Sequence, residues 1–177
     1  SRGLVNLVSS ADALPAFVLE KNIELLTRHG ILTREEMLAR HEIHMENYCK
    51  VIRIEASTLI DIVQHTLLSA GTTYVSHLCE AIMRKKTALP GESCRVETAL
   101  ASSVSQLSAA LLDRAAELKT ALDTMPADYC AEEQLHYCHD VIFARMGRVR
   151  ETIDHMETLV ASEFWPVPTY YDLLFSV

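Results

Sequence analysis

The sequence contains little glycine and little proline, and this shortage argues against a disordered chain. Five residues of each among 177 make about 6% of the chain, half the usual share of about 12%. Alanine, leucine, glutamate and methionine are plentiful, a composition that favours helices. Because 49% of the residues are hydrophobic and 23% are charged, the chain can bury a core.

The chain also lacks a surplus of basic residues, a long apolar run and paired cysteines. A net charge of -8, without a basic stripe longer than three residues, argues against nucleic-acid binding. The longest uncharged stretch, Ile62 to Cys79, is interrupted by polar side chains, so we expect no membrane span. Five cysteines without a CxxC pair predict reduced thiols in a cytoplasmic protein, with no disulfide framework and no zinc knuckle.

Helix-terminal signals predict two helices in the first half of the chain. The first covers residues 11–30, with Pro15 in its first turn and Gly30 as the C-terminal stop. Thr33 followed by Glu36 forms a capping box, which begins a second helix over 33–89. Gly71 either bends this helix, which is then one helix of some 55 residues, about 80 Å long, or breaks it into two helices.

Two turns predict the rest of the secondary structure. Pro90-Gly91 is the clearest turn in the sequence, and a third helix follows over 93–124. Pro126 marks the next turn, with a fourth helix over 127–163. The last residues, 164–177, contain two prolines and several aromatic side chains. We expect this tail to be extended and docked on another part of the protein.

Seven-residue repeats predict the core of the third and fourth helices. One set recurs at Val104, Leu111, Leu118 and Met125, with Leu100, Leu107, Arg114 and Ala121 as its partner set. The fourth helix carries Leu135, Ile142, Val149 and Met156, interleaved with His139, Met146, Ile153 and Val160. Such narrow seams favour antiparallel neighbours. The sequence therefore predicts one all-α domain over 1–177, an elongated antiparallel bundle of about four helices, three of them long.

The second helix has apolar residues on more than one side between Val51 and Leu68. A helix with a single apolar stripe buries only that stripe. We therefore expect this helix to be contacted on more than one face.

Three groups of residues could carry chemistry, and each also has a structural interpretation. Glu133 and His136, with His139 and Asp140, have a spacing seen in metal-binding bundles, but a di-iron site needs a second Glu-x-x-His, which is missing. His41, His44 and Glu46 are the second candidate group, more simply read as surface residues. Cys130 and Cys138 are the third, and both are expected to be small core residues.

The motifs typical of common enzyme sites are missing from the sequence, namely the phosphate loop, Gly-x-Ser-x-Gly and the dinucleotide fingerprint. We therefore predict no catalytic, cofactor or metal residue in this chain.

Two passages resemble the C-terminal region of type III glutamine synthetase. The first is Leu14–Thr33 (LPAFVLEKNIELLTRHGILT) running on to Glu46–Ala56 (ENYCKVIRIEA), and the second is Glu163–Val177 (EFWPVPTYYDLLFSV). The resemblance covers most of the chain in order. It implies a shared helical ending before Ala56, an insertion from about Ala56 to Ser162, and a tail that returns to the domain or to a catalytic body. Tyr171 stands where the family has glycine, which puts a positive φ at that position in doubt.

The resemblance also implies what the larger protein does. The family joins ammonia to glutamate with ATP and Mg²⁺ or Mn²⁺ in nitrogen metabolism, through residues upstream of this region, and assembles into ring-shaped homo-oligomers. This chain would then be a C-terminal domain that serves packing, assembly or regulation, with the upstream catalytic domain and further copies as partners. The candidate interface residues are those of the tail: Phe164, Trp165, Tyr170, Tyr171, Leu174 and Phe175.

Two alternatives from other classes remain open at the level of the sequence. One is a free-standing bundle that binds metal through Glu133, His136 and His139. The other is a free-standing adaptor whose acidic fourth helix docks a basic partner, since residues 126–163 carry eight acidic and three basic side chains. Such docking weakens with salt.

Overall fold

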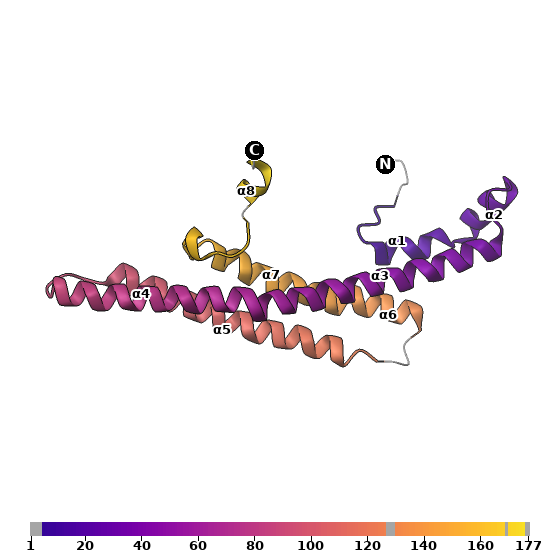
Figure 1. Ribbon diagram of the computed structural model, residues 1–177. Helices are drawn as coiled ribbons and strands as arrows, with labels where there is room; N and C mark the ends of the chain where they lie inside the picture. Colours follow the sequence, from indigo (N-terminus) through magenta and orange to yellow (C-terminus); the bar gives the residue numbers. More distant parts are fainter. Residues whose placement is uncertain (1–4, 127–129, 169, 176–177) are drawn as a thin grey trace. The chain divides into compact units, whose positions relative to one another are not determined.

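The computed structural model describes residues 5–126, 130–168 and 170–175. Within these ranges every regular element is a helix and no strand occurs, which confirms the predicted all-α fold (Figure 1). The elements are α1 (Ser10–Phe17), α2 (Glu20–Arg28), α3 (Arg34–Ile62), the π-helical turn η1 (Val63–Leu67), α4 (Leu68–Ala88), α5 (Arg95–Asp123), α6 (Ala131–Tyr137), the π-helical turn η2 (Cys138–Phe143), α7 (Ala144–Glu157), the 3₁₀ turn η3 (Ser162–Phe164) and α8 (Tyr170–Phe175).

The helix predicted over residues 11–30 is divided into α1 and α2. Pro15 lies inside α1 and not in its first turn, and a proline in a helix interior removes one backbone hydrogen bond and crowds the preceding turn. The helix ends two residues later, and Leu19 is extended, with φ -60° and ψ 139°. The side-chain amide of Asn22 donates to the Ala16 carbonyl over 2.6 Å, beside a longer bond of 3.4 Å from the Leu19 N–H, so the end of α1 is closed by both.

The predicted stop at Gly30 and the predicted start at Thr33 are both confirmed. Gly30 has φ +62°, and the Ile31 N–H donates to the Leu26 carbonyl over 3.0 Å, the bond that closes a helix at a left-handed glycine. At the next start, the Thr33 N–H donates to the Glu36 carboxylate over 2.8 Å. The Glu36 N–H donates in return to the Thr33 hydroxyl over 3.2 Å.

The long second helix continues through Gly71 without a break. Regular α4 runs from Leu68 to Ala88 with Gly71 buried inside it. The irregularity lies earlier, in the π-helical turn Val63–Leu67, where one extra residue is inserted in the helix. This position carries no glycine or proline signal, which is why the sequence placed the irregularity at Gly71.

The fourth predicted helix and the tail differ from expectation. The helix over 127–163 begins at Ala131 and ends at Glu157, and residues 127–129 lie outside the described ranges. The tail over 164–177 is not extended throughout, because Tyr170–Phe175 form α8 with Asp172 favourably placed in the first turn. Residues 169, 176 and 177 of the tail also lie outside the described ranges.

Contacts divide the chain into two compact units: Ser1–Ala56 with Ala121–Ala144, and Ser57–Thr120 with Arg145–Val177. The first unit buries side chains from α1, α2, α3, the end of α5, α6 and η2, namely Ala11, Ile23, Met37, Met45, Cys49, Ile52, Ala56, Ala121, Leu135, Cys138 and Ile142. The second buries Ile60, Val63, Leu67, Tyr74, Leu78, Cys94, Val104, Leu111, Ala115, Leu118, Val149, Met156 and Val160. The prediction of one domain over 1–177 stays a prediction.

The heptad prediction of the core is confirmed for all but one member of one set on each helix. Val104, Leu111 and Leu118 on α5 have no exposed surface, and the same holds for the set Leu135, Ile142, Val149 and Met156. Met125, the last member of the first set, lies beyond the end of α5 and is only half-buried. In the partner set, Arg114 is half-buried. Its guanidinium donates to the Arg148 carbonyl over 2.6 Å and to the Thr152 hydroxyl over 2.5 Å. A charged residue on the seam thus ties α5 to α7 through hydrogen bonds.

Helices α4, α5 and α7 of the second unit approach closely at Gly71. A Cβ added to Gly71 would overlap the Met156 methyl group and would lie 2.7 Å from the Ser108 hydroxyl. Met156 is fully buried, and the Ser108 hydroxyl donates to the Val104 carbonyl over 2.8 Å. A side chain at position 71 would therefore displace the Met156 methyl group within a packed core and crowd the Ser108 hydroxyl.

We predict opposite effects for the same substitution at two helical glycines. Gly147→Ala in α7 meets nothing within 4 Å and should raise the free energy of unfolding by about 0.5–1 kcal/mol, because alanine favours a helix over glycine. Gly71→Ala should lower it by about 1 kcal/mol, because overpacking exceeds that gain. Chemical denaturation followed by circular dichroism measures both. Equal stabilisation by the two variants would contradict the close approach.

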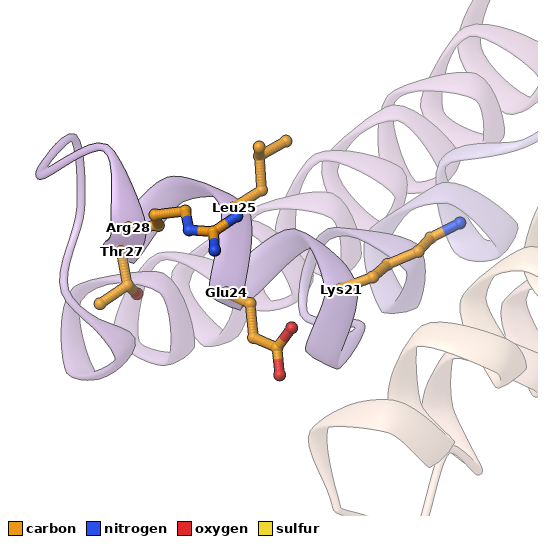
Figure 2. A pocket seen from close by; sticks show the side chains of 5 residues that line it. All are labelled: Lys21, Glu24, Leu25, Thr27 and Arg28. Carbon is orange, nitrogen blue, oxygen red and sulfur yellow. The ribbon is translucent and has the colours of Figure 1, made fainter.

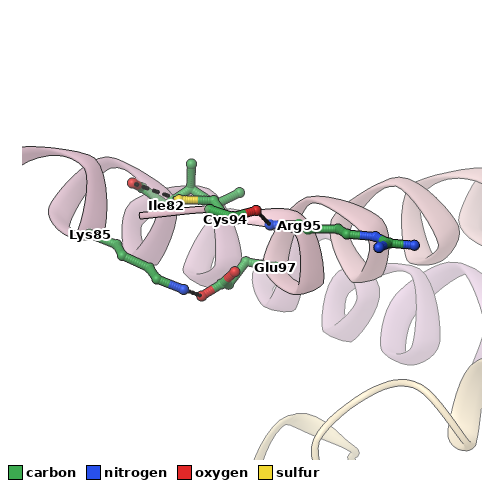
Figure 3. Close-up of polar contacts among 6 residues, drawn as sticks. Ile82, Lys85, Cys94, Arg95 and Glu97 are labelled. Atoms are coloured by element: carbon green, nitrogen blue, oxygen red, sulfur yellow. Dashed lines mark hydrogen bonds and ion pairs between the residues drawn. The ribbon is translucent and has the colours of Figure 1, made fainter. Parts of the chain in front are cut away.

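An ion pair closes the α4–α5 hairpin (Figure 3). The Lys85 ammonium donates to the Glu97 carboxylate over 2.8 Å, with side chains 34% and 23% exposed. Beside it, the Cys94 thiol donates to the Ile82 carbonyl over 4.0 Å. The hydrogen bond from Lys85 holds the pKa of Glu97 below its ordinary value of 4.5. The same bond raises the pKa of Lys85 above 10.5.

The pair should make the stability of the hairpin depend on pH. Because the pKa of Glu97 is lowered in the folded state, its stabilisation is present above pH 4.5 and is lost as the pH falls through the folded pKa. We expect Glu97→Gln to be less stable than the parent protein at neutral pH, with the difference vanishing in acid. Unfolding curves between about pH 3 and pH 7 measure this. Lys85→Met is the control: a pH-independent difference in both variants would contradict the ion pair.

Candidate functional site

The predicted interface tail separates into a part that packs on this chain and a part that is exposed. The ring of Phe164, in η3, lies 5.3 Å from the ring of Tyr74 and 5.1 Å from that of His77, centroid to centroid. Both partners belong to α4 of the same unit. Offset aromatic pairs at such distances add about 0.5–1.5 kcal/mol to the burial of their surfaces. At Phe164, the tail therefore packs on α4 of this same chain.

Trp165 continues this packed part of the tail. Its side chain is half-buried, and its indole N–H is buried without a hydrogen-bond partner among the described residues. A buried indole N–H usually finds an acceptor.

The helix α8 presents the exposed part of the tail. Leu173, Leu174 and Phe175 are 63%, 73% and 64% exposed. Tyr170 and Tyr171, also predicted as interface residues, have side chains outside what the structure describes. Neighbouring exposed apolar residues of this kind mark interaction surfaces more often than isolated ones do.

The candidate metal ligands around Glu133 have structural partners instead. The Glu133 carboxylate accepts a hydrogen bond from the Cys130 N–H over 2.9 Å, which caps the start of α6 and lowers the pKa of Glu133. His139 Nδ1 lies 2.7 Å from an Asp140 carboxylate oxygen, and its ring stacks on Phe143 at 6.2 Å. The spacing of Cys130 and Glu133 is that of a capping box, but with cysteine in place of the usual Ser or Thr.

The second candidate group, on α3, is not assembled into a site either. His44 is exposed, as predicted, whereas His41 is half-buried and its Nε2 has no hydrogen-bond partner among the described residues. Over the described ranges as a whole, His, Cys, Asp and Glu side chains form no group of three that could hold a metal ion.

The cysteines are all free thiols and differ in burial. Cys138 is fully buried, as predicted, whereas Cys130 is exposed at the start of α6, so the core prediction is wrong there. Burial raises the pKa of Cys138 to about 12 and also raises that of Cys49, whose thiol is hydrogen-bonded to it. Because the thiolate is the nucleophilic form, these buried thiols are unreactive.

A shallow hollow on α2 is lined by charged side chains that do not converge on one point (Figure 2). It is lined by Lys21, Glu24, Leu25, Thr27 and Arg28. The Lys21 ammonium points away from the Arg28 guanidinium, and the Glu24 carboxylate lies between them. Two diverging cations with an anion between them give little preference for an anionic ligand.

Hydropathy gives one further finding about the described helices. None of them combines the length and the apolar character that crossing a membrane requires.

Comparison with known proteins identifies the relatives of this chain. Residues 1–86 match the glutamine synthetase C-terminal domain, so the match continues past Ala56, where the resemblance placed the start of an insertion. The chain is 34% identical to a glutamine synthetase of Butyrivibrio fibrisolvens and 32% identical to a type-3 glutamine synthetase of Dictyostelium discoideum. A glutamine synthetase of Bacteroides fragilis (strain YCH46) is 24% identical. Each alignment covers 99% of this chain but only 24–25% of the relative.

The two parts of the tail should respond differently to truncation of a side chain. Phe164→Ala should lower the free energy of unfolding by about 2 kcal/mol, because it removes a half-buried ring and two aromatic contacts. Leu174→Ala should change it by less than about 0.5 kcal/mol, as is usual for an exposed side chain. Denaturation of the two variants measures the difference. If Leu174→Ala proved the more destabilising, the division of the tail would be wrong.

Proposed function

The chain carries the C-terminal domain of the glutamine synthetase family over residues 1–86, and from this we propose that it is the C-terminal helical part of a larger, type III enzyme. In this proposal it serves packing and assembly, and the rest of the enzyme carries the chemistry. The observation that carries the proposal is that 99% of the chain aligns with glutamine synthetases of which it spans about a quarter.

The larger protein would ligate ammonia to glutamate with ATP and Mg²⁺ or Mn²⁺. In this proposal those ligands bind to the three quarters of the enzyme outside these 177 residues. Within this chain, the Glu133 carboxylate caps a helix start and the His139 ring pairs with Asp140, so neither is held ready for a metal ion. Free thiols, two of them buried with raised pKa values, suit a reducing cytoplasm.

The exposed apolar residues of α8 support a role in assembly. Leu173, Leu174 and Phe175 expose most of their surface, and burying such side chains against another subunit is the usual source of association energy. The proposed partners are the upstream catalytic part and further copies in a ring-shaped homo-oligomer.

The experiment has two steps, and the first tests whether these residues belong to a larger polypeptide. An antibody against this chain is used to find the native polypeptide in source-cell extract under denaturing conditions. We expect a species several times heavier than 19.8 kDa. A band near that mass would overturn the proposal.

The second step tests assembly in the full-length enzyme. The double variant Leu174→Ser with Phe175→Ser should shift the enzyme from its assembled form to smaller species in sedimentation velocity, while circular dichroism stays unchanged. Leu112→Ser on α5, also about half exposed, is the matched control and should assemble like the parent enzyme. Unchanged assembly of the double variant would remove the role of α8.

A further inference from the structure

Helix α3 has two apolar faces, and only one of them is buried in its unit. The buried face is formed by Met45, Cys49, Ile52 and Ala56. At about 100° per residue, Ile43, Val51 and Ile54 fall on the opposite side of the same helix. They are 61%, 42% and 59% exposed. We call these three residues the outer face of α3.

A shallow hollow lies on the same side of the helix as the outer face. It is lined by Glu36, Ala39, Arg40, Ile43 and His44, so Ile43 belongs both to the hollow and to the outer face. The combination of apolar side chains with a rim of charged ones is typical of the surfaces that other protein segments contact. This surface accounts for the pattern in the sequence that predicted contacts on more than one face of the helix.

We propose that the outer face of α3 is the surface on which the preceding part of the same, longer polypeptide docks. This inference rests on the proposed function, since it requires a larger chain. The inference adds two points to the proposed function: a second interface, distinct from α8, and the part of the protein that occupies this interface.

The length of chain outside the structure supports this occupant. The relatives that align with nearly all of this chain are about four times as long, so a larger protein has some three quarters of its residues available to cover the face. The outer face also lies within residues 1–86, the part matched by the family. A surface in the shared part of the chain suits a partner that all family members possess.

The area of the outer face argues against a second copy as the occupant. Together the three residues expose less than two whole aliphatic side chains, whereas a stable interface buries about 800 Å² on each partner. A segment of the same polypeptide needs less area, because the covalent link gives it an effective concentration of order millimolar or higher.

The experiment uses the full-length protein with a single thiol introduced on the outer face. Ile43→Cys is treated with a maleimide, and peptide mass spectrometry measures the labelling rate at position 43 in native and denatured protein. We expect at least a tenfold slower rate in the native protein. Leu112→Cys, 52% exposed on α5, is the matched control for reagent access. Labelling of Ile43→Cys at the denatured rate would overturn the inference.

A photo-reactive residue identifies the occupant. With p-benzoylphenylalanine in place of Ile43, irradiation should give a product with the mass of one polypeptide, cross-linked to a peptide that precedes this chain. A product with twice that mass, or a cross-link within these 177 residues, would overturn the inference.

The two proposals can fail separately. If the native polypeptide is itself near 19.8 kDa, the proposed function fails. If it is larger and the introduced thiol labels rapidly, only the docking inference fails.

Discussion

The close approach of three helices at Gly71 is the constraint on which the second unit depends. Gly71 leaves room for the Met156 methyl group and the Ser108 hydroxyl, so that α5 and α7 both contact the same turn of α4. The buried residues nearby, such as Leu67 and Leu111, pack in the same core. A glycine inside this helix, despite its low helix propensity, leaves the space that the two neighbouring side chains fill.

Polar side chains in this chain chiefly position backbone. Glu36 and Glu133 cap helix starts, Asn22 caps the end of α1, and Arg114 binds a carbonyl of the neighbouring helix. Each satisfies a group that would otherwise be exposed at a helix end or left open at a packed seam. Residues that a search for ligands would select are thus used to fix where helices begin, end and meet.

Apolar side chains, in contrast, exceed what the chain buries by itself. The outer face of α3 and the exposed residues of α8 both consist of large aliphatic or aromatic groups. Burial of such groups is the main favourable term in protein association. This surplus is the observation on which the proposed role in assembly rests.

The sequence by itself determined the helical fold, the boundaries at Gly30 and Thr33, and the buried heptad residues of α5, α6 and α7. These follow from local rules, namely glycine conformation, capping spacing and apolar periodicity, which act within a few residues. Only the tertiary structure decided that Pro15 divides the first helix, that the irregularity of the second lies at Val63–Leu67, and that Phe164 packs on Tyr74 and His77. The packing of Phe164 depends on residues far apart in the chain, and local propensity does not specify such contacts. The break after Pro15 is a local effect, but it appears only once the structure places the proline in the helix interior and not in the first turn.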